Sequence, residues 1–450
     1  MKTRRTFIKQ TMAVSAGFAG LSFYLSGYKF PEERALVEVN KWLELPKGFT
    51  AKIISKWGDT MDDGLLVPAR ADGMAAFEVG GKTVIIRNHE NSQLPSAFGA
   101  FGQDMSLVKK LRPDQFFDHG FGKTPGLGGT TTMVFDDAGQ KVEKQFLSLA
   151  GTNRNCAGGP TPWNTWISCE EDVTNKGTEC ESYHGYNFEV PASGDGLINP
   201  IPIKAMGRFN HEAVAVSPET GIVYQTEDRP DSLIYRFVPN QPGELHQGGT
   251  LQALAIMNVP SFDTRNYDEE AISVGESLEV EWITLNQVDP EEDDLRFRGF
   301  AAGATLFARG EGMWYGNDEV YFACTSGGKN KSGQVFKYKP SPAEGTRAEK
   351  QNPGKLTLFA EPNDKEILKY CDNLTVAPWG DVIIVEDTPD AYMRGIRPDG
   401  EIYNIGRNIG SKSELAGVCF SPSGKSLFVN VQEEGLTFSI TGPWEKLRTT

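Results

Sequence analysis

A strand–turn–strand unit that recurs along the chain constrains the fold more than any other sequence feature. The clearest copy has two apolar runs, Ala213–Val216 and Ile222–Thr226, joined by the segment Ser217–Gly221. Proline and glycine in that segment favour a turn, so the unit predicts a β-hairpin. In an antiparallel hairpin the start of the first strand and the end of the second lie side by side. Glu212 and Glu227 are therefore expected to meet at one open end.

Five further segments repeat this pattern. They are Asp72–Glu90, Cys156–Glu170, Glu311–Thr325, Asn373–Asp387 and Glu414–Gln432. Strand-rich repeats about 40 to 100 residues apart are typical of β-propeller blades, whose first strands line a central channel. The chain is therefore predicted to be all-β, a six-bladed β-propeller with long inserted loops. One predicted insertion is the phenylalanine-rich segment 96–127, and the polar segment 261–285 is expected to be an excursion between the third and fourth units.

Closure of the propeller would bring one end of every hairpin to the same axial mouth. The residues expected there, all candidate metal ligands, are Glu90, Cys156, Glu170, Glu212, Glu227, Glu311, Asn373 and Glu386. Close carboxylates repel one another unless cations lie between them, so such a ring predicts bound metal. Oxygen ligands suit calcium, and one thiolate among carboxylates indicates a transition metal as well.

The first residues of the chain are predicted to be a targeting segment. Arg4 and Arg5 precede a mildly apolar run that is rich in glycine and serine. This pattern predicts a twin-arginine signal over residues 1–28, with residues 29–450 forming a single β-propeller catalytic domain. A membrane anchor is the alternative, but the apolar run is too short for one. The protein is thus expected to meet the twin-arginine export machinery, to be periplasmic or secreted, and to have no stable membrane insertion after export.

The charge of the chain argues against anionic partners. The net charge is −15, and removal of the four basic residues in the signal leaves about −19. Nucleic acid and anionic membrane surfaces are therefore not expected as partners.

The six cysteines do not share one role. An even number in an exported chain suggests disulfides, and Cys169 and Cys180 are the nearest pair in the sequence. Cys324 and Cys419, however, lie in apolar strand patterns where a free buried thiol is the more common state. Cys156 occupies the repeat position at which other units carry oxygen ligands. It is predicted to bind metal, with a disulfide or a buried thiol as the alternatives.

Several segments of the chain resemble the PhoX-type alkaline phosphatases, a family of bacterial enzymes exported by the twin-arginine pathway. The matching stretches, in the family's order, are Arg87–Glu90, Gly128–Thr132, Asn155–Trp163, Cys169–Glu171, Asn210–Glu212, Thr226–Arg229, Arg309–Gly312, Asp372–Asn373 and Val385–Asp387. The resemblance implies a propeller whose axial site holds two ferric ions and two to three calcium ions, with a cysteine thiolate as an iron ligand. It also implies hydrolysis of small phosphate monoesters, and some diesters are kept as further candidate substrates.

Arg309 and Glu311 are the candidate catalytic residues under this resemblance. Arg309 lies in a glycine-flanked turn two residues before Glu311. A guanidinium group at that point can bind phosphate through two nitrogens while Glu311 binds a cation. The alternative role for Arg309 is a salt bridge to the acidic ring.

Two other functions are compatible with the predicted fold. A calcium-dependent lactonase or esterase would use a few of the acids at the same mouth but would leave Cys156 without a role. A non-enzymatic binding propeller, stiffened by calcium, is the second alternative, because propellers host many functions.

Overall fold

The computed structural model describes residues 35–93 and 98–448, and these residues form β-strands and connecting loops almost throughout. Within them the α-helices are α2 (Leu295–Ala301) and α3 (Glu445–Arg448). Neither helix has the length and apolar character needed to cross a membrane. The short 3-10 turns are η2 (Val108–Lys110), η3 (Pro113–Gln115), η4 (Gly120–Gly122), η5 (Lys204–Met206), η6 (Leu245–Gln247) and η7 (Arg347–Gln351). The predicted signal over residues 1–28 lies outside the described residues.

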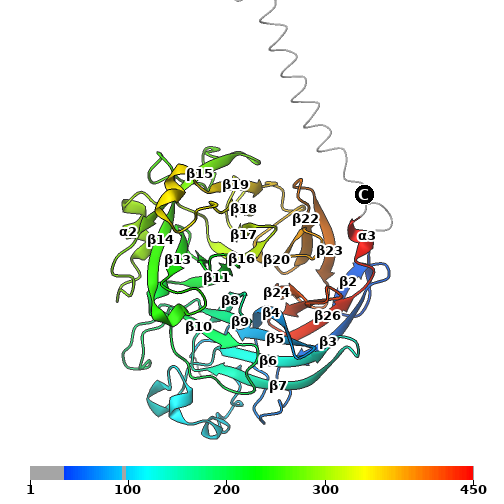
Figure 1. The fold of residues 1–450 in the computed structure, drawn as a ribbon. Helices are drawn as coiled ribbons and strands as arrows, with labels where there is room; N and C mark the ends of the chain where they lie inside the picture. Colours follow the sequence, from blue (N-terminus) through cyan, green and yellow to red (C-terminus); the bar gives the residue numbers. More distant parts are fainter. Residues whose placement is uncertain (1–34, 94–97, 449–450) are drawn as a thin grey trace, which may run out of the picture.

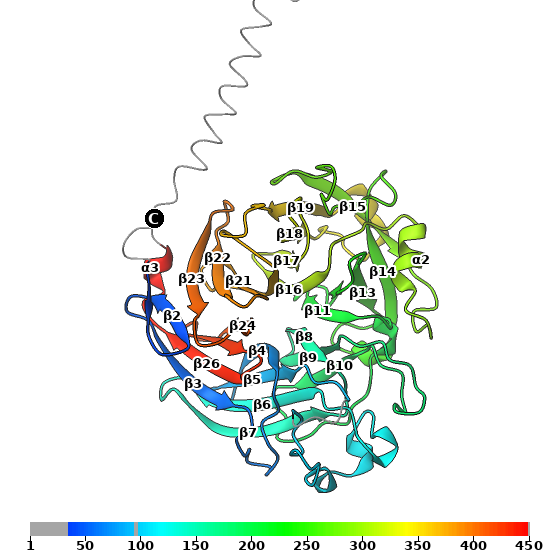
Figure 2. The same cartoon turned by 180° about the vertical axis from the view of Figure 1, so that it is seen from behind.

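Six blades surround a central axis (Figures 1 and 2). The strands of the first three follow the chain: β4 (Ala71–Val79), β5 (Lys82–His89), β6 (Gly129–Asp136) and β7 (Lys141–Ala150) in blade 1; β8 (Asn155–Pro160), β9 (Thr165–Glu170) and β10 (Asn187–Pro191) in blade 2; β11 (His211–Val216), β12 (Val223–Glu227), β13 (Ile234–Pro239) and β14 (Gly249–Ile256) in blade 3. Neighbouring strands within each blade pair antiparallel.

Blade 4 also follows the chain, whereas blades 5 and 6 combine strands from both ends of it. These three blades contain β16 (Gly310–Gly316), β17 (Glu319–Cys324), β18 (Gln334–Lys339) and β19 (Lys355–Ala360) in blade 4; β20 (Cys371–Val376), β21 (Val382–Glu386), β22 (Tyr392–Ile396), β23 (Ile402–Asn408), β2 (Leu43–Pro46) and β1 (Leu36–Glu38) in blade 5; β24 (Leu415–Phe420), β25 (Ser426–Val431), β26 (Leu436–Thr441) and β3 (Thr50–Lys56) in blade 6.

The ring is closed by strands from the two ends of the chain. β3 pairs antiparallel with β26 in blade 6, and β2 pairs with β23 in blade 5. Figure 1 shows the blue β3 beside the red β26, and the blue β2 beside the brown-orange β23. Pairing of the N-terminal strands with the C-terminal blades covers sheet edges that would otherwise be open.

The predicted all-β, six-bladed propeller is confirmed. The first strands, β4, β8, β11, β16, β20 and β24, contact one another in order around the axis, and β24 contacts β4. One feature differs from the expectation: the described strands form five hydrogen-bonded sheets, because β15 (Ser277–Thr284) pairs with both β14 and β19 and joins blades 3 and 4. β15 lies in the predicted polar excursion, and most of its residues are partly or fully exposed.

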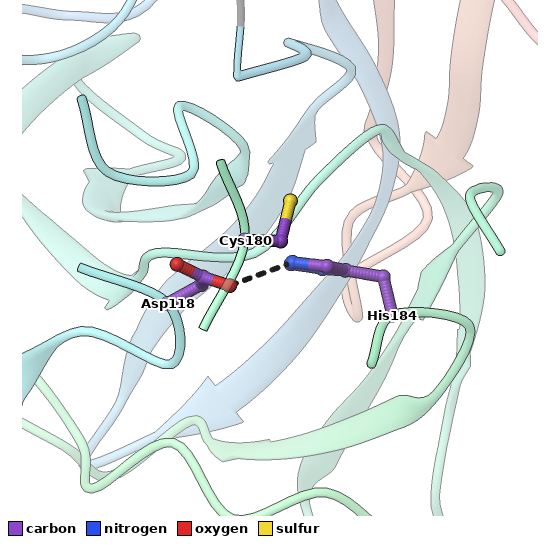
Figure 3. A group of neighbouring side chains, drawn as sticks. All are labelled: Asp118, Cys180 and His184. Carbon is purple, nitrogen blue, oxygen red and sulfur yellow. Dashed lines mark hydrogen bonds and ion pairs between the residues drawn. The ribbon is translucent and has the colours of Figure 1, made fainter. Parts of the chain in front are cut away.

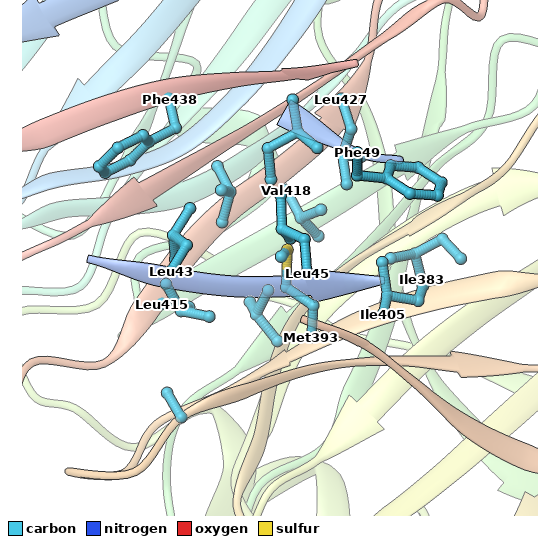
Figure 4. Close-up of a cluster of buried hydrophobic side chains, with 14 of the residues drawn as sticks. Leu43, Leu45, Phe49, Ile383, Met393, Ile405, Leu415, Val418, Leu427 and Phe438 are labelled. Carbon is cyan, nitrogen blue, oxygen red and sulfur yellow. The ribbon is translucent and has the colours of Figure 1, made fainter. Parts of the chain in front are cut away.

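Hydrophobic cores lie between successive blades. The core between blades 5 and 6 includes Leu43 and Leu45 of β2, Met393 of β22 and Phe438 of β26 (Figure 4). Comparable clusters fill the other five interfaces between blades. Each fully buried Leu, Met or Phe side chain contributes about 1.5–3 kcal/mol. The blades therefore form a packed frame that fixes the positions of the first strands.

The predicted aromatic insertion lies against the outer strand of blade 1. Phe101, Phe116 and Leu127 are buried against Leu147 of β7. The insertion contains the 3-10 turns η2, η3 and η4 and no longer helix within residues 98–127. It packs against the outside of the fold, beside the loops that lead to the axial mouth.

Candidate active site

A shared irregularity in the first strands aims one side chain from most blades at the axis. In blade 3 the pair His211↔Glu227 is followed by Val214↔Gln225, which leaves Glu212 and Ala213 unpaired. Irregularities of this kind bend a strand and redirect side chains. The first unpaired residue in five blades is a potential metal ligand: Asp72, Cys156, Glu212, Glu311 or Asp372.

The sixth blade carries Gly417 at the corresponding position. Its φ is +63°, and a Cβ there would lie 2.2 Å from the backbone oxygen of Asp72. Glycine is required at this point because β24 passes close to the first strand of blade 1. This blade instead contributes Glu414 and Gln432 to the mouth.

The second strands supply a further set of acids. Glu90, Glu171, Asp228 and Asp387 each directly follow the last residue of a second strand. All four line the same cavity as the first-strand residues. Two positions per hairpin therefore provide the acids of the site.

These residues enclose an acidic cavity of about 120 Å³ at the axial mouth. Its lining residues are Asp72, Glu90, Arg154, Cys156, Glu171, Glu212, Asp228, Arg309, Glu311, Asp372, Asp387, Glu414 and Gln432. Nine carboxylates face two guanidinium groups, so seven negative charges are uncompensated when all the acids are ionised. Mutual repulsion of this size favours the binding of multivalent cations.

The pKa values of the central acids reflect this crowding. Burial raises the pKa of Glu212 well above its ordinary value, and the charges of Asp372 and Glu171 raise it further. Burial also raises the pKa of Asp372 and of Glu171 to about 8. Burial and the charge of Glu212 likewise raise the pKa of the Cys156 thiol. A bound cation offsets both effects, so this donor set fits metal ions.

The donors form two groups of three that share one residue. Cys156, Glu171 and Glu212 form the first group, and Glu212, Glu311 and Asp372 form the second. Within each group one ligand atom per residue lies within 4.8 Å of the others. The first group contains the thiol and suits a transition metal, whereas the second offers only oxygen and suits calcium. Glu212 is placed to bind at both.

Two arginines occupy equivalent positions at the rim of the cavity. Arg154 and Arg309 directly precede the first strands of blades 2 and 4, and both have left-handed backbone, with φ of 45° and 53°. Arg154 pairs with Glu90, with Nη2–Oε1 at 2.7 Å, and with Glu171. Strained backbone of this kind is common where a fold must position a functional side chain.

Arg309 has the corresponding contacts. Its Nε donates to Asp228 Oδ1 at 2.7 Å, and its Nη2 donates to Asp228 Oδ2 at 2.9 Å and to Glu311 Oε1 at 2.8 Å. Burial lowers the pKa of Arg309, but the bond to Asp228 and the charge of Glu311 raise it overall. In both arginines Nη1 donates to no group within the described residues, and the side chains are 38% and 35% exposed. In each guanidinium, Nε and Nη2 are therefore held by carboxylates, whereas Nη1 is available to bind another group.

Comparison with known proteins decides the family. The sequence profile of "Alkaline phosphatase PhoX" matches residues 32–435. The chain belongs to the PhoX alkaline phosphatase family. PhoX proteins are metal-dependent phosphatases, and the metal-compatible acidic cavity agrees with that membership. No curated protein sequence matches the chain.

The chain is also similar to solved structures, two of which are gluconolactonases or described as such. One, described as a "putative gluconolactonase", is 13% identical with a TM-score of 0.42, and the match covers 88% of this chain and 93% of that one. The other is a gluconolactonase from Xanthomonas campestris, 13% identical with a TM-score of 0.40, and the match covers 91% of this chain and 100% of that one. Both scores are too low to bear on the activity of the PhoX chain.

The structure brings together five of the residues singled out from the sequence. Glu90, Cys156, Glu212, Arg309 and Glu311 all line the acidic cavity. They come from blades 1 to 4, and only Arg309 and Glu311 are close together in the sequence. Closure of the propeller is what makes them neighbours.

Three of the expected ligands, Glu170, Glu227 and Glu386, lie outside the cavity. Each is the last residue of its second strand, and its carboxylate accepts backbone N–H groups from neighbouring segments: Gly185 and Tyr186 for Glu170, Leu233 for Glu227, and Lys369 and Tyr392 for Glu386. Each also has a basic partner, namely His184, Arg296 and Arg394 respectively. These buried acids hold loops in place, and the residue after each of them reaches the axis instead.

Asn373 lies just below the cavity. Its Nδ2 donates to Asp372 Oδ1 at 3.1 Å, and its Oδ1 accepts from the backbone N–H of Gly417. Asn373 lines the axial channel with Ala157, Ala213 and Gly312, which occupy the second unpaired position in their blades. The residue of blade 5 that lines the cavity is thus Asp372, one residue before the expected Asn373.

The cysteines are all free and buried within the described residues. The suggested Cys169–Cys180 disulfide is not formed. Cys324 and Cys419 are buried in strands, as expected from their apolar sequence context.

Proposed function

We propose that this PhoX phosphatase hydrolyses phosphate monoesters at a mixed iron and calcium centre in the acidic cavity. The observation that carries the proposal is the pair of donor groups joined by Glu212, of which only one contains a thiol. A single calcium site, as in the lactonase alternative, gives no role to Cys156 or to the second group. The pair instead fits two kinds of metal held side by side.

The residues that would hold the metals follow from the two groups. Cys156, Glu171 and Glu212 would hold ferric iron, and Glu311 and Asp372 would hold calcium together with Glu212. The outer acids Glu90, Asp228, Asp387 and Glu414, with Asp72, would complete a set of two ferric and two to three calcium ions. When bound, such ions supply Lewis-acid activation of the phosphate and an activated oxygen nucleophile.

The arginines would bind the substrate anion. Arg154 and Arg309 present their Nη1 edges at the rim, and the carboxylates behind them fix their orientation. A guanidinium edge is well suited to the equatorial oxygens of a phosphoryl group. Glu311 accepts a hydrogen bond from Arg309 and belongs to the donor group that it forms with Glu212 and Asp372. It would therefore link the phosphate-binding arginine to a bound metal ion.

The size of the cavity bears on the substrate class. The metal ions and one phosphoryl group would occupy much of this cavity of about 120 Å³. The leaving group would remain outside the mouth, which suits small phosphorylated substrates of varied structure. A diester must place both of its substituents there, so diesters are proposed as slower substrates.

The location of the reaction is proposed from the sequence pattern at Arg4 and Arg5. Twin-arginine export carries folded proteins, so the metals would be inserted before export. The enzyme would then act in the periplasm or outside the cell, without membrane insertion.

An assay of natively exported protein tests the function. We expect iron and calcium to copurify with the protein, and a phosphate monoester to be hydrolysed faster than a phosphodiester or a sugar lactone. Metal content is measured by mass spectrometry and turnover by released phosphate or acid. Calcium alone, with lactone hydrolysis and no phosphate release, would contradict the proposal.

Cys156→Ser is expected to remove visible absorption from the protein. A thiolate bound to ferric iron gives a charge-transfer band, and a serine oxygen does not reproduce it. The spectrum of the wild type and of Cys156→Ser should be recorded at equal concentration after native export. Cys419→Ser is the matched control, because Cys419 is equally buried but lies in the core between blades 6 and 1. A fully active, colourless wild type would refute the role given to Cys156.

A further inference from the structure

A second cluster of potential metal ligands lies in the loops beside blade 2, outside the acidic cavity. It consists of Asp118 from the aromatic insertion and of Cys180 and His184 from the loop between β9 and β10 (Figure 3). All three residues are buried, and one ligand atom from each lies within 4.8 Å of the others. Asp118 Oδ2 and His184 Nε2 are 3.3 Å apart.

A fourth donor completes the group. Gln93 Oε1 lies 2.8 Å from Cys180 Sγ. The Gln93 amide is held in this orientation because its Nε2 donates to the backbone oxygens of Thr124, at 2.7 Å, and Glu179, at 3.0 Å. Three separate loop segments therefore bring together a carboxylate, an imidazole and a thiol, with an amide oxygen beside the thiol.

The groups behind these donors orient them as ligands of a metal are usually oriented. His184 Nδ1 lies 2.7 Å from Glu170 Oε1, so the imidazole can donate there and turn Nε2 toward the cluster. Asp118 accepts backbone N–H groups from Gly120 at 2.8 Å and from Ser182 at 2.9 Å. A carboxylate behind a ligating histidine fixes its tautomer and raises its basicity.

The spacing suits a small tetrahedral ion. Ligands bound to zinc at about 2.0–2.3 Å lie roughly 3.5 Å apart. The 3.3 Å between Asp118 and His184 and the upper limit of 4.8 Å for all three ligand atoms require only small side-chain shifts. The mixture of sulfur, nitrogen and oxygen donors favours zinc over calcium or magnesium.

We propose that Cys180, His184, Asp118 and Gln93 form a structural zinc site, separate from the catalytic metals. With four protein ligands the site is closed, as structural zinc sites are. The zinc ion would connect the loop after Glu90 and the loop after Glu171 to the aromatic insertion. Because Glu90 and Glu171 line the acidic cavity, the zinc site would stabilise two of its walls. Glu170 then has a defined role, because it orients His184 while the adjacent Glu171 lines the cavity.

The competing arrangement contains no metal. A protonated His184 would lie between Asp118 and Glu170 and donate to both. In that case Cys180 would be a buried thiol bonded to Gln93. Zinc binding distinguishes the two arrangements, and it does so whether or not the catalytic proposal holds.

The decisive experiment is anomalous diffraction from crystals of the natively exported protein. We expect a peak above the zinc absorption edge, absent below it, between Cys180 and His184. If as-purified crystals lack the peak, crystals soaked in micromolar zinc should show it. Soaked crystals with no density between these side chains would overturn the proposal.

Variants measure the same site in solution. Cys180→Ala should lose one equivalent of zinc and weaken zinc binding at least about 100-fold, while the iron and calcium contents stay unchanged. Cys419→Ala, the matched buried-cysteine control, should keep the zinc. If Cys180→Ala does not fold, His184→Gln serves the same purpose, because glutamine keeps a polar side chain in the loop. Zinc content equal to that of the wild type in the folded variant would also overturn the proposal.

Discussion

Glu212→Gln is expected to lower kcat/KM by at least about 100-fold and to empty both metal groups of the acidic cavity. Glu212 is the only residue shared by the two groups, and it is buried beside the carboxylates of Asp372 and Glu171. Glutamine keeps the volume of the side chain but removes the negative charge. Loss of one direct ligand should cost at least as much as loss of a residue that merely orients a ligand, which typically costs about 10- to 100-fold in metal affinity or activity.

The matched control for this variant is Glu227→Gln. Glu227 is also a buried acid of blade 3, on the strand that pairs with the strand of Glu212. It accepts a hydrogen bond from Tyr235 Oη at 2.8 Å and lies outside the cavity. Glutamine can still accept that hydrogen bond, so metals and turnover should stay near those of the wild type. Metal content and phosphate release should be measured together for both variants. Equal losses in Glu212→Gln and Glu227→Gln would show that general destabilisation, and not ligand loss, is responsible.

The fold followed from the sequence because it depends on repetition. Each hairpin carries its own strand periodicity and turn, and six such units have few arrangements other than a closed ring. The extra pairing of β15 was missed because the segment 261–285 is polar as a whole, although Leu278, Val280 and Trp282 alternate with polar residues within it. Only the pairing with β14 on one side and β19 on the other shows that this short alternating pattern belongs to a sheet.

The choice of acids at the ends of the second strands was less predictable. Glu170-Glu171, Glu227-Asp228 and Glu386-Asp387 are doublets, and the hairpin pattern alone does not say which member faces the axis. Successive side chains on a strand point in opposite directions, so only one member can do so. Blade 1 carries His89-Glu90 at the same point, where the second member is the acid. Comparison of the four pairs would have selected Glu171, Asp228 and Asp387.

A similar signal was present for the first strand of blade 5. A proline lies six residues after Cys156 and six residues after Glu212, and Pro378 lies six residues after Asp372. Alignment on these prolines selects Asp372 over Asn373. The Asp118, Cys180 and His184 cluster, in contrast, had no sequence signal, because it forms only when the aromatic insertion folds back against blade 2.

The contacts of Arg309 bear on whether this residue binds phosphate or only stabilises the structure. Its Nε and Nη2 are already bound to Asp228 and Glu311, so both a structural and a substrate-binding role are physically possible. The available Nη1 edge favours the second, since a purely structural arginine has no need of an exposed edge at the mouth. Arg265→Ala is the matched control: Arg265 binds Asp263 through two nitrogens, at 2.8 and 2.6 Å, but lies outside the cavity.

Arg309→Ala is expected to raise the activation barrier in kcat/KM by about 2–4 kcal/mol, by analogy with the loss of a preorganised oxyanion donor. A guanidinium can follow the charge that develops on the phosphoryl oxygens, so its removal should weaken binding of the transition state more than binding of the ester. Arg309→Lys should lose less, because lysine keeps the charge but not the planar fork. Metal content should remain near that of the wild type in both variants and in Arg265→Ala. If Arg309→Ala instead loses its metals, or unfolds at a much lower temperature while the remaining holoenzyme turns over normally, Arg309 serves as a counter-charge to Asp228 and Glu311 and does not bind phosphate.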